Sequence, residues 1–193
     1  VEEGLDSKLH ETVYTVNYQD VLILVLNSTD FLEKQTEYIQ EKLSNSDAKW
    51  KIVTCHHSVF SPAQGRDFEY ARKNWKPLFD KYGVDLVLNG HDHTYARGHI
   101  PIKTTDNNKS SNFNTLYITS VSGPKQYKIG LEQIKNYQLD GYKNDKIGEQ
   151  TQFFQVISIN EETLTYKAYT VLGDEYDTAI IKKDFSSGIK TLR

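Results

Sequence analysis

Short apolar runs alternate with longer amphipathic stretches over the first hundred residues. The runs at 52–55 and 84–88 are rich in Val, Ile and Leu, which is typical of strands that are buried on both faces of a sheet. Between them, residues 67–82 place apolar side chains at helical spacing, and Pro77 should kink or restart that helix because proline lacks a backbone donor. The pattern predicts a β-α-β unit over residues 51–97.

The chain before this unit predicts a hairpin and one helix. Residues 13–18 alternate between apolar and polar positions, and the continuous apolar run 21–26 follows after a short turn. Asp30 and Glu33 have the spacing of a helix capping box. One apolar face then continues for about three turns, formed by Leu32, Thr36, Ile39 and Leu43.

The chain after Arg97 is more polar and richer in turns. We expect a loop at 104–114, a strand at 115–121, a long surface loop with some helix at 125–150, and three antiparallel strands at 153–159, 163–170 and 177–183. The fold class is therefore α/β, with a mixed sheet and a mostly antiparallel second sheet. We expect one domain over 1–193, in which 115–183 supplies the strands of the second sheet.

Net charge, the length of the apolar runs and the cysteine count limit the kinds of molecule that this protein is expected to bind. A net charge of −3, from 23 basic and 26 acidic residues, gives no field that favours nucleic acid or an anionic membrane, and no apolar run is long enough to span a bilayer. Cys55 is the only cysteine, which excludes an internal disulfide and leaves the redox compartment open; in an apolar strand it should be a buried residue. Many Tyr, Lys and Asn residues are in keeping with a secreted or cell-surface bacterial protein.

Four of the six histidines follow the two strands of the β-α-β unit, at His56, His57, His91 and His93. Parallel strands end at the same edge of a sheet, so these side chains can face one pocket. Neutral imidazoles gathered in this way indicate a transition metal such as Zn, Fe, Mn or Ni. If the chain is extended there, His91 and His93 point the same way, whereas His57 points away from His56 and serves as a substrate contact or packs at the rim. Asp92 should face outward.

Residues 53–57 and 89–97 resemble the second half of a calcineurin-like metallophosphoesterase, most of all its purple-acid-phosphatase-like branch. The resemblance implies the carboxyl-terminal part of a four-layer α-β-β-α sandwich with a centre of two Fe, Zn or Mn ions. By position, His56 and His91 would bind one metal and His93 the other. Arg97 lies where the family continues with Tyr-x-Arg; it could contact phosphate or pair with an acid. A weaker likeness extends over 14–183.

The family's earlier motifs, Asp-x-His, Gly-Asp and Gly-Asn-His, do not occur ahead of the histidine motifs, and the sequence contains no Met. We therefore expect a fragment or processed product whose partner is the missing amino-terminal half of the same domain. In this chain the metal site would be partial or empty. The family's additional histidine between the two motifs is also absent, since 58–90 contains none.

The resemblance implies a hydrolase that cleaves phosphomonoesters or phosphodiesters by attack of a metal-bound hydroxide, with His57 and Arg97 as catalytic candidates. The chain alone would lack full activity. Two alternatives stay open. The first is a metal-binding or interaction module without turnover. The second is a mononuclear zinc hydrolase of peptides or amides with His56, His91 and His93 as ligands.

Overall fold

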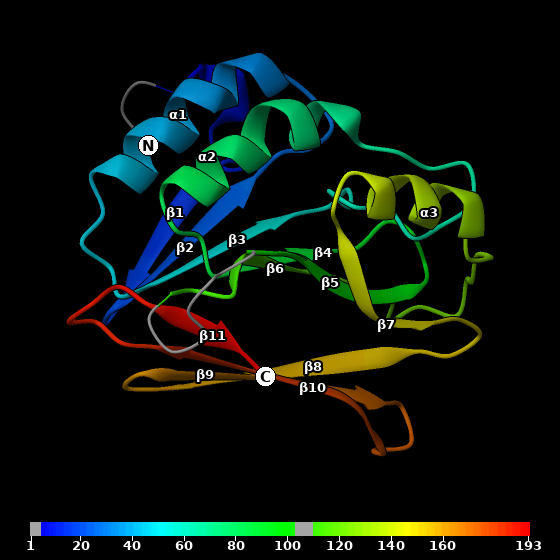
Figure 1. Cartoon of the computed structure of the whole chain (residues 1–193). Helices are drawn as coiled ribbons and strands as arrows, with labels where there is room; N and C mark the ends of the chain where they lie inside the picture. The colour runs from blue at the N-terminus through cyan, green and yellow to red at the C-terminus, as the bar shows by residue number, and fades with distance from the viewer. Residues whose placement is uncertain (1–4, 103–109) are drawn as a thin grey trace.

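A computed structural model describes residues 5–102 and 110–193. It has three layers: helices cover one face of a large sheet, and a smaller sheet packs on the other face (Figure 1). The expected α/β fold with two sheets is confirmed. Within the described ranges no helix covers the outer face of the small sheet, so three layers of the expected four are present. No helix in these ranges is long and apolar enough to cross a membrane.

Seven strands form the large sheet in the order β1-β2-β3-β4-β6-β5-β7. They are β1 (Tyr14–Tyr18), β2 (Val21–Leu26), β3 (Trp50–Cys55), β4 (Leu86–Asn89), β5 (Tyr95–Pro101), β6 (Phe113–Thr119) and β7 (Lys143–Gly148). The small sheet has the order β11-β10-β9-β8, from β8 (Phe153–Asn160), β9 (Thr163–Thr170), β10 (Glu175–Lys183) and β11 (Lys190–Leu192). The helices are α1 (Leu32–Ser44), α2 (Lys76–Lys81) and α3 (Leu131–Leu139), with a π-helical segment at Ala71–Trp75 and a 3-10 turn at Ser7–Leu9.

The β-α-β unit is present as predicted. Strands β2, β3 and β4 are parallel, and Cys55 at the end of β3 is level with Leu26 on one side and Asn89 on the other. Pro77 lies in the first turn of α2, where its missing N–H removes no helical hydrogen bond, and the preceding turn is π-helical rather than α-helical. The three parallel strands therefore present the segments that follow them at one edge.

The start of α1 differs from the capping box that the sequence suggests. Phe31 occupies the cap position in a left-handed conformation (φ 48°) and makes no side-chain cap. Instead the Gln35 side chain accepts from Asn27 N at 3.0 Å and donates to Asn27 O and Asp30 O at 2.7 and 2.9 Å. The buried Gln35 amide thus replaces the predicted pair of Asp30 and Glu33.

The segment 115–183 differs from the expectation in two places, and the first is that not all of its strands belong to the second sheet. Strand β6 pairs with β4 and β5 in the large sheet. The segment 125–150, expected as a surface loop with some helix, contains α3 and also β7, which pairs with β5 at the edge of the large sheet. The meander of β8, β9 and β10 is confirmed. Most of the expected loop at 104–114 lies outside the described residues.

A buried carboxylate joins the two sheets through ion pairs. Asp85 is fully buried, accepts from Lys51 N at 2.9 Å, and pairs with Lys183 and Lys190 at 3.1 and 3.2 Å. Since these lysines come from β10 and β11, the small sheet is fastened to the start of β4. These ion pairs hold the amino-terminal end of β4 in place, and the histidines follow the carboxyl-terminal ends of β3 and β4.

Candidate metal centre

Three of the four predicted histidines meet at the ends of β3 and β4. The ring centroids of His56 and His91 are 4.9 Å apart, those of His57 and His91 are 4.0 Å apart, and those of His56 and His57 are 5.3 Å apart. His56 Nε2 lies 3.0 Å from His91 Nδ1. The parallel strands thus bring together side chains that are 35 positions apart in the sequence.

The histidine loop is not extended, so the condition for a common direction of His91 and His93 is not met. Both residues have positive φ, 66° and 50°, and Gly90 N donates to His56 O at 3.0 Å at the start of the turn. His93 turns toward the next loop, where its Nδ1 lies 2.9 Å from Lys125 O and its ring 4.8 Å from the Tyr127 ring. His93 is therefore the one member of the proposed ligand set that faces a different partner.

His57 faces the site, although alternation along a strand predicted that it points away. The chain leaves the strand after Cys55, and Ser28 Oγ accepts from His57 N at 2.9 Å and lies 2.9 Å from its Nδ1. Burial, with the nearby His56 and Arg66, lowers the pKa of His57. Burial and the surrounding cationic groups lower the pKa of His91 to about 4. These imidazoles are therefore neutral at pH 7, and the neutral form of His is the one that binds a metal.

Arg66 is a site residue that the sequence reasoning missed. Its guanidinium contacts His91 Nε2 and donates to Tyr127 Oη at 3.0 Å, with the Tyr127 ring 4.7 Å below it. The available clue was its position directly after Gly65, between the first histidine pair and the helical pattern that starts at residue 67. Arg66 places a planar cation against the imidazoles, at the point where an anion could be held.

Asp92 was expected to face outward, and this is wrong. The residue is 1% exposed, and burial raises the pKa of its carboxyl group. The hydroxyls of Ser58 and Ser61 lie nearby, yet neither carboxylate oxygen has a hydrogen bond of good geometry among the described residues. A buried carboxylate without a partner is costly, so this group needs a cation or a donor.

The donor set fits a transition metal in its chemistry, because neutral imidazoles and a buried carboxylate are ligands of Zn, Fe and Mn. Asp92, His57 and His91 line one hollow of about 240 Å³. The ring nitrogens do not converge on one point, because His56 Nε2 lies against His91 Nδ1 and the Arg66 guanidinium contacts His91 Nε2. Accordingly, the described part of the chain contains no group of three His, Cys, Asp or Glu side chains arranged to hold an ion.

Arg97 and His99 belong to a separate ion-pair cluster. Arg97 Nε and Nη2 donate to the two oxygens of Asp177 at 2.7 and 3.0 Å, and Nη1 lies 3.2 Å from Asp145 Oδ2. His99 is a buried residue of β5 whose Nδ1 lies 2.7 Å from Asp145 Oδ2. Of the two roles left open for Arg97, the structure supports the pairing with acids.

Cys55 is buried at the end of β3, as expected. Burial raises the pKa of its thiol to about 12, and Asn89 Nδ2 lies 3.2 Å from Sγ. The thiolate is the reactive form of cysteine, so Cys55 is a packing residue and not a nucleophile.

Comparison with known proteins agrees with this geometry. Residues 6–95 match the family model of the calcineurin-like phosphoesterases. Purple acid phosphatase 3 of Arabidopsis thaliana is 28% identical over 150 residues, which are 77% of this chain and 37% of that protein. An uncharacterized protein of Mycobacterium tuberculosis is 40% identical over 73 residues, which are 34% of this chain and 14% of that protein.

Among solved structures, the fold is similar to that of purple acid phosphatase PPD1 from yellow lupin seeds, with a TM-score of 0.63 at 18% identity. That match covers 91% of this chain and 33% of the lupin chain. The chain thus spans about a third of the length of the Arabidopsis and lupin proteins. Motifs, fold and relatives agree: the chain is similar to the calcineurin-like phosphoesterases and, among them, to the purple acid phosphatases.

Proposed function

We propose that this chain supplies the histidine side of the metal centre of a phosphoesterase that hydrolyses phosphomonoesters or phosphodiesters. The observation that carries the proposal is the meeting of His56, His57 and His91 at one sheet edge, beside the unpaired carboxylate of Asp92. Relatives named as acid phosphatases add to it. When bound, the metal ions supply Lewis acidity that activates water and offsets the charge of the phosphate group.

Each residue has a role in this proposal. His56 and His91 hold one metal, and His93 holds the second after it leaves the Lys125 carbonyl. Arg66 moves away from His91 and donates hydrogen bonds to the phosphate, because its planar guanidinium can bind two oxygens at once. His57, fixed by Ser28, contacts the substrate or transfers a proton.

The remaining ligands of a two-metal centre would come from outside this sequence. Asp-x-His, Gly-Asp and Gly-Asn-His do not occur ahead of the histidine motifs in this sequence, and the chain covers 33% of its lupin structural neighbour. The alternative of a binding module without turnover is favoured by one observation, the lack of a three-ligand group in the described residues. The orientation of His93 toward Lys125 gives no support to a mononuclear centre of three histidines.

The experiment is a titration of this chain with Zn²⁺ and Mn²⁺ by calorimetry, followed by assays with p-nitrophenyl phosphate and its bis ester. We expect weak metal binding that His91→Ala reduces at least tenfold. His10→Ala is the matched control, since His10 lies away from the site and contacts Leu5 O. Equal binding by His91→Ala and the unaltered chain would refute the site. Metal binding without hydrolysis of either ester, by this chain and by a longer chain that includes the missing motifs, would favour the binding module.

A further inference from the structure

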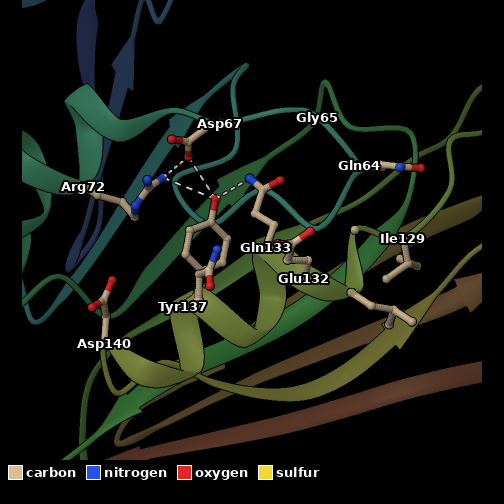
Figure 2. A pocket seen from close by; sticks show the side chains of 12 residues that line it. Gln64, Gly65, Asp67, Arg72, Ile129, Glu132, Gln133, Tyr137 and Asp140 are labelled. Atoms are coloured by element: carbon tan, nitrogen blue, oxygen red, sulfur yellow. Dashed lines mark hydrogen bonds and ion pairs between the residues drawn. The ribbon is translucent and has the colours of Figure 1, made fainter.

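A second hollow lies directly beside the histidine site. It has a volume of about 690 Å³ and separates the loop around Gly65 from helix α3 (Figure 2). Its lining mixes apolar surface with polar and charged side chains, which are Gln64, Asp67, Arg72, Glu132, Asn136 and Asp140, among others. We refer to this hollow as the α3 cleft.

The α3 cleft and the histidine hollow are neighbours. Gly65 and Asp67 line both of them, so the two spaces meet at this short segment. A molecule with one end against His57 and His91 would therefore place its other end in the α3 cleft. The cleft has the position of a subsite for the part of a substrate that is not phosphate.

One wall of the α3 cleft is held in place by hydrogen bonds, which Figure 2 shows as dashed lines. Tyr137 Oη donates to Asp67 Oδ1 at 2.9 Å and accepts from Gln133 Nε2 at 2.7 Å. Arg72 pairs with Asp67 at 2.5 Å, and its guanidinium lies 4.7 Å from the Tyr137 ring. These contacts neutralise the charges of Asp67 and Arg72 and fix the shape of the wall before any ligand arrives.

Helix α3 is docked against the loop by its backbone. Gly130 N donates to Pro62 O at 2.8 Å, and Gln64 N donates to Lys128 O at 3.0 Å. A Cβ at position 130 would lie 3.0 Å from the Gln64 Cα, so only glycine allows this approach without a shift. The two sides of the cleft therefore hold a defined separation.

Four polar side chains remain available to a ligand. Among the described residues, no hydrogen bond or ion pair engages the side chains of Gln64, Glu132, Asn136 or Asp140. The two amides both donate and accept, and the two carboxylates accept from hydroxyl groups. Because Asp67 and Arg72 cancel each other, Glu132 and Asp140 leave the cleft negative, which disfavours a further anionic group.

We propose that the α3 cleft binds the alcohol part of the phosphate ester, and that this alcohol is uncharged and carries several hydroxyl groups, as in a sugar or polyol phosphate. This inference rests on the proposed phosphoesterase function for its phosphate end. The negative charge of the cleft disfavours nucleoside di- and triphosphates, because their additional phosphates would be repelled by Glu132 and Asp140.

The first test needs neither metal nor turnover. ¹⁵N-labelled chain is titrated with glucose, and we expect saturable shift changes confined to amides around Gln64 to Asp67 and along α3. Asn136→Ala should weaken this binding at least fivefold. Lys135→Ala is the matched control, because Lys135 lies on the same helix, is exposed and does not line the cleft. His91→Ala should leave glucose binding unchanged. Absence of saturable changes, or equal binding by Asn136→Ala, overturns the proposal.

The second test asks whether the two spaces act on one molecule. With Zn²⁺ present, glucose 6-phosphate should bind at least tenfold more tightly than inorganic phosphate, since a linked ligand engages both sites at once. Asn136→Ala should remove that advantage and leave phosphate binding intact. Equal affinity for both compounds in the unaltered chain, or ATP producing the same changes along α3, overturns the assignment. Failure of metal or phosphate binding alone refutes the proposed function, whereas the glucose titration reports on the cleft by itself.

Discussion

Replacing Arg97 with Met tests whether this residue is structural, as its contacts indicate. The Arg97 side chain is 12% exposed, and its partners Asp177 and Asp145 are 6% and 11% exposed. The substitution leaves two buried carboxylates without their shared cation. Tyr95 Oη still donates to Asp177 at 2.7 Å, and His99 and Lys143 still face Asp145 at 2.7 and 3.0 Å.

The size of the effect follows from these contacts. Removing one partner of a buried ion pair costs about 3–5 kcal/mol of unfolding free energy. Since both carboxylates keep other donors, we expect the lower end, about 3 kcal/mol, which lowers the melting temperature of a chain of this size by roughly 6–12 °C. Metal and phosphate binding at the histidine site should stay unchanged, because Arg97 touches none of those residues.

Urea unfolding and thermal melting of Arg97→Met provide the measurement, with Lys167→Met as the matched control. Lys167 pairs with Glu175 at 2.6 Å, but these side chains are 38% and 47% exposed, so water and salt screen this pair and it adds little to stability. A structural role for Arg97 is refuted if Arg97→Met has the same melting temperature as the unaltered chain but loses phosphate binding. That pattern would return Arg97 to the catalytic set.

Three further predictions concern the scaffold. Asp85→Asn should lower the unfolding free energy in urea by about 3–5 kcal/mol, because Lys190 would stay buried without its anion, and a loss below 1 kcal/mol would contradict this. Gly98→Ala should cost about 1–3 kcal/mol in the same assay, since the added methyl meets the Lys143 carbonyl and the Tyr142 ring; an unchanged midpoint would contradict the close packing of β5 and β7. Burial acts to raise the pKa of Asp145, but His99, Lys143 and Arg97 outweigh it and lower the pKa. The stabilisation by Asp145 is therefore complete above the ordinary carboxyl pKa of about 3.9 and is lost as the pH falls through the lower native value. Asp145→Asn should flatten the acid limb of stability against pH, and an unaltered acid limb would count against this pairing.

The regular part of the fold follows from local patterns. The apolar runs of β2, β3 and β4 predict buried parallel strands, and parallel strands must end at a common edge, which is why His56 and His91 could be paired from the sequence. Strand β7 could not be found in this way. It is a sheet edge with exposed and half-exposed charged residues, so its sequence carries no alternation of apolar and polar positions.

The details of the site depend on backbone geometry that residue types do not specify. Positive φ at His91 and His93 turns the loop, which buries Asp92 and directs His93 to Lys125. Alternation along an extended chain predicted the opposite for Asp92. Arg66 was missed because its contact with His91 joins two loops, and no local pattern reveals such a contact.

The central claim is that His56 and His91 bind one metal ion together. X-ray absorption at the zinc edge of the chain, loaded with less than one equivalent of Zn²⁺, measures this directly. We expect at least two imidazole nitrogens at about 2.0–2.1 Å, and His56→Ala and His91→Ala should each remove this imidazole scattering while His10→Ala keeps it. A shell of oxygen ligands alone, or a spectrum that His91→Ala leaves unchanged, would show that the two histidines do not share a metal ion.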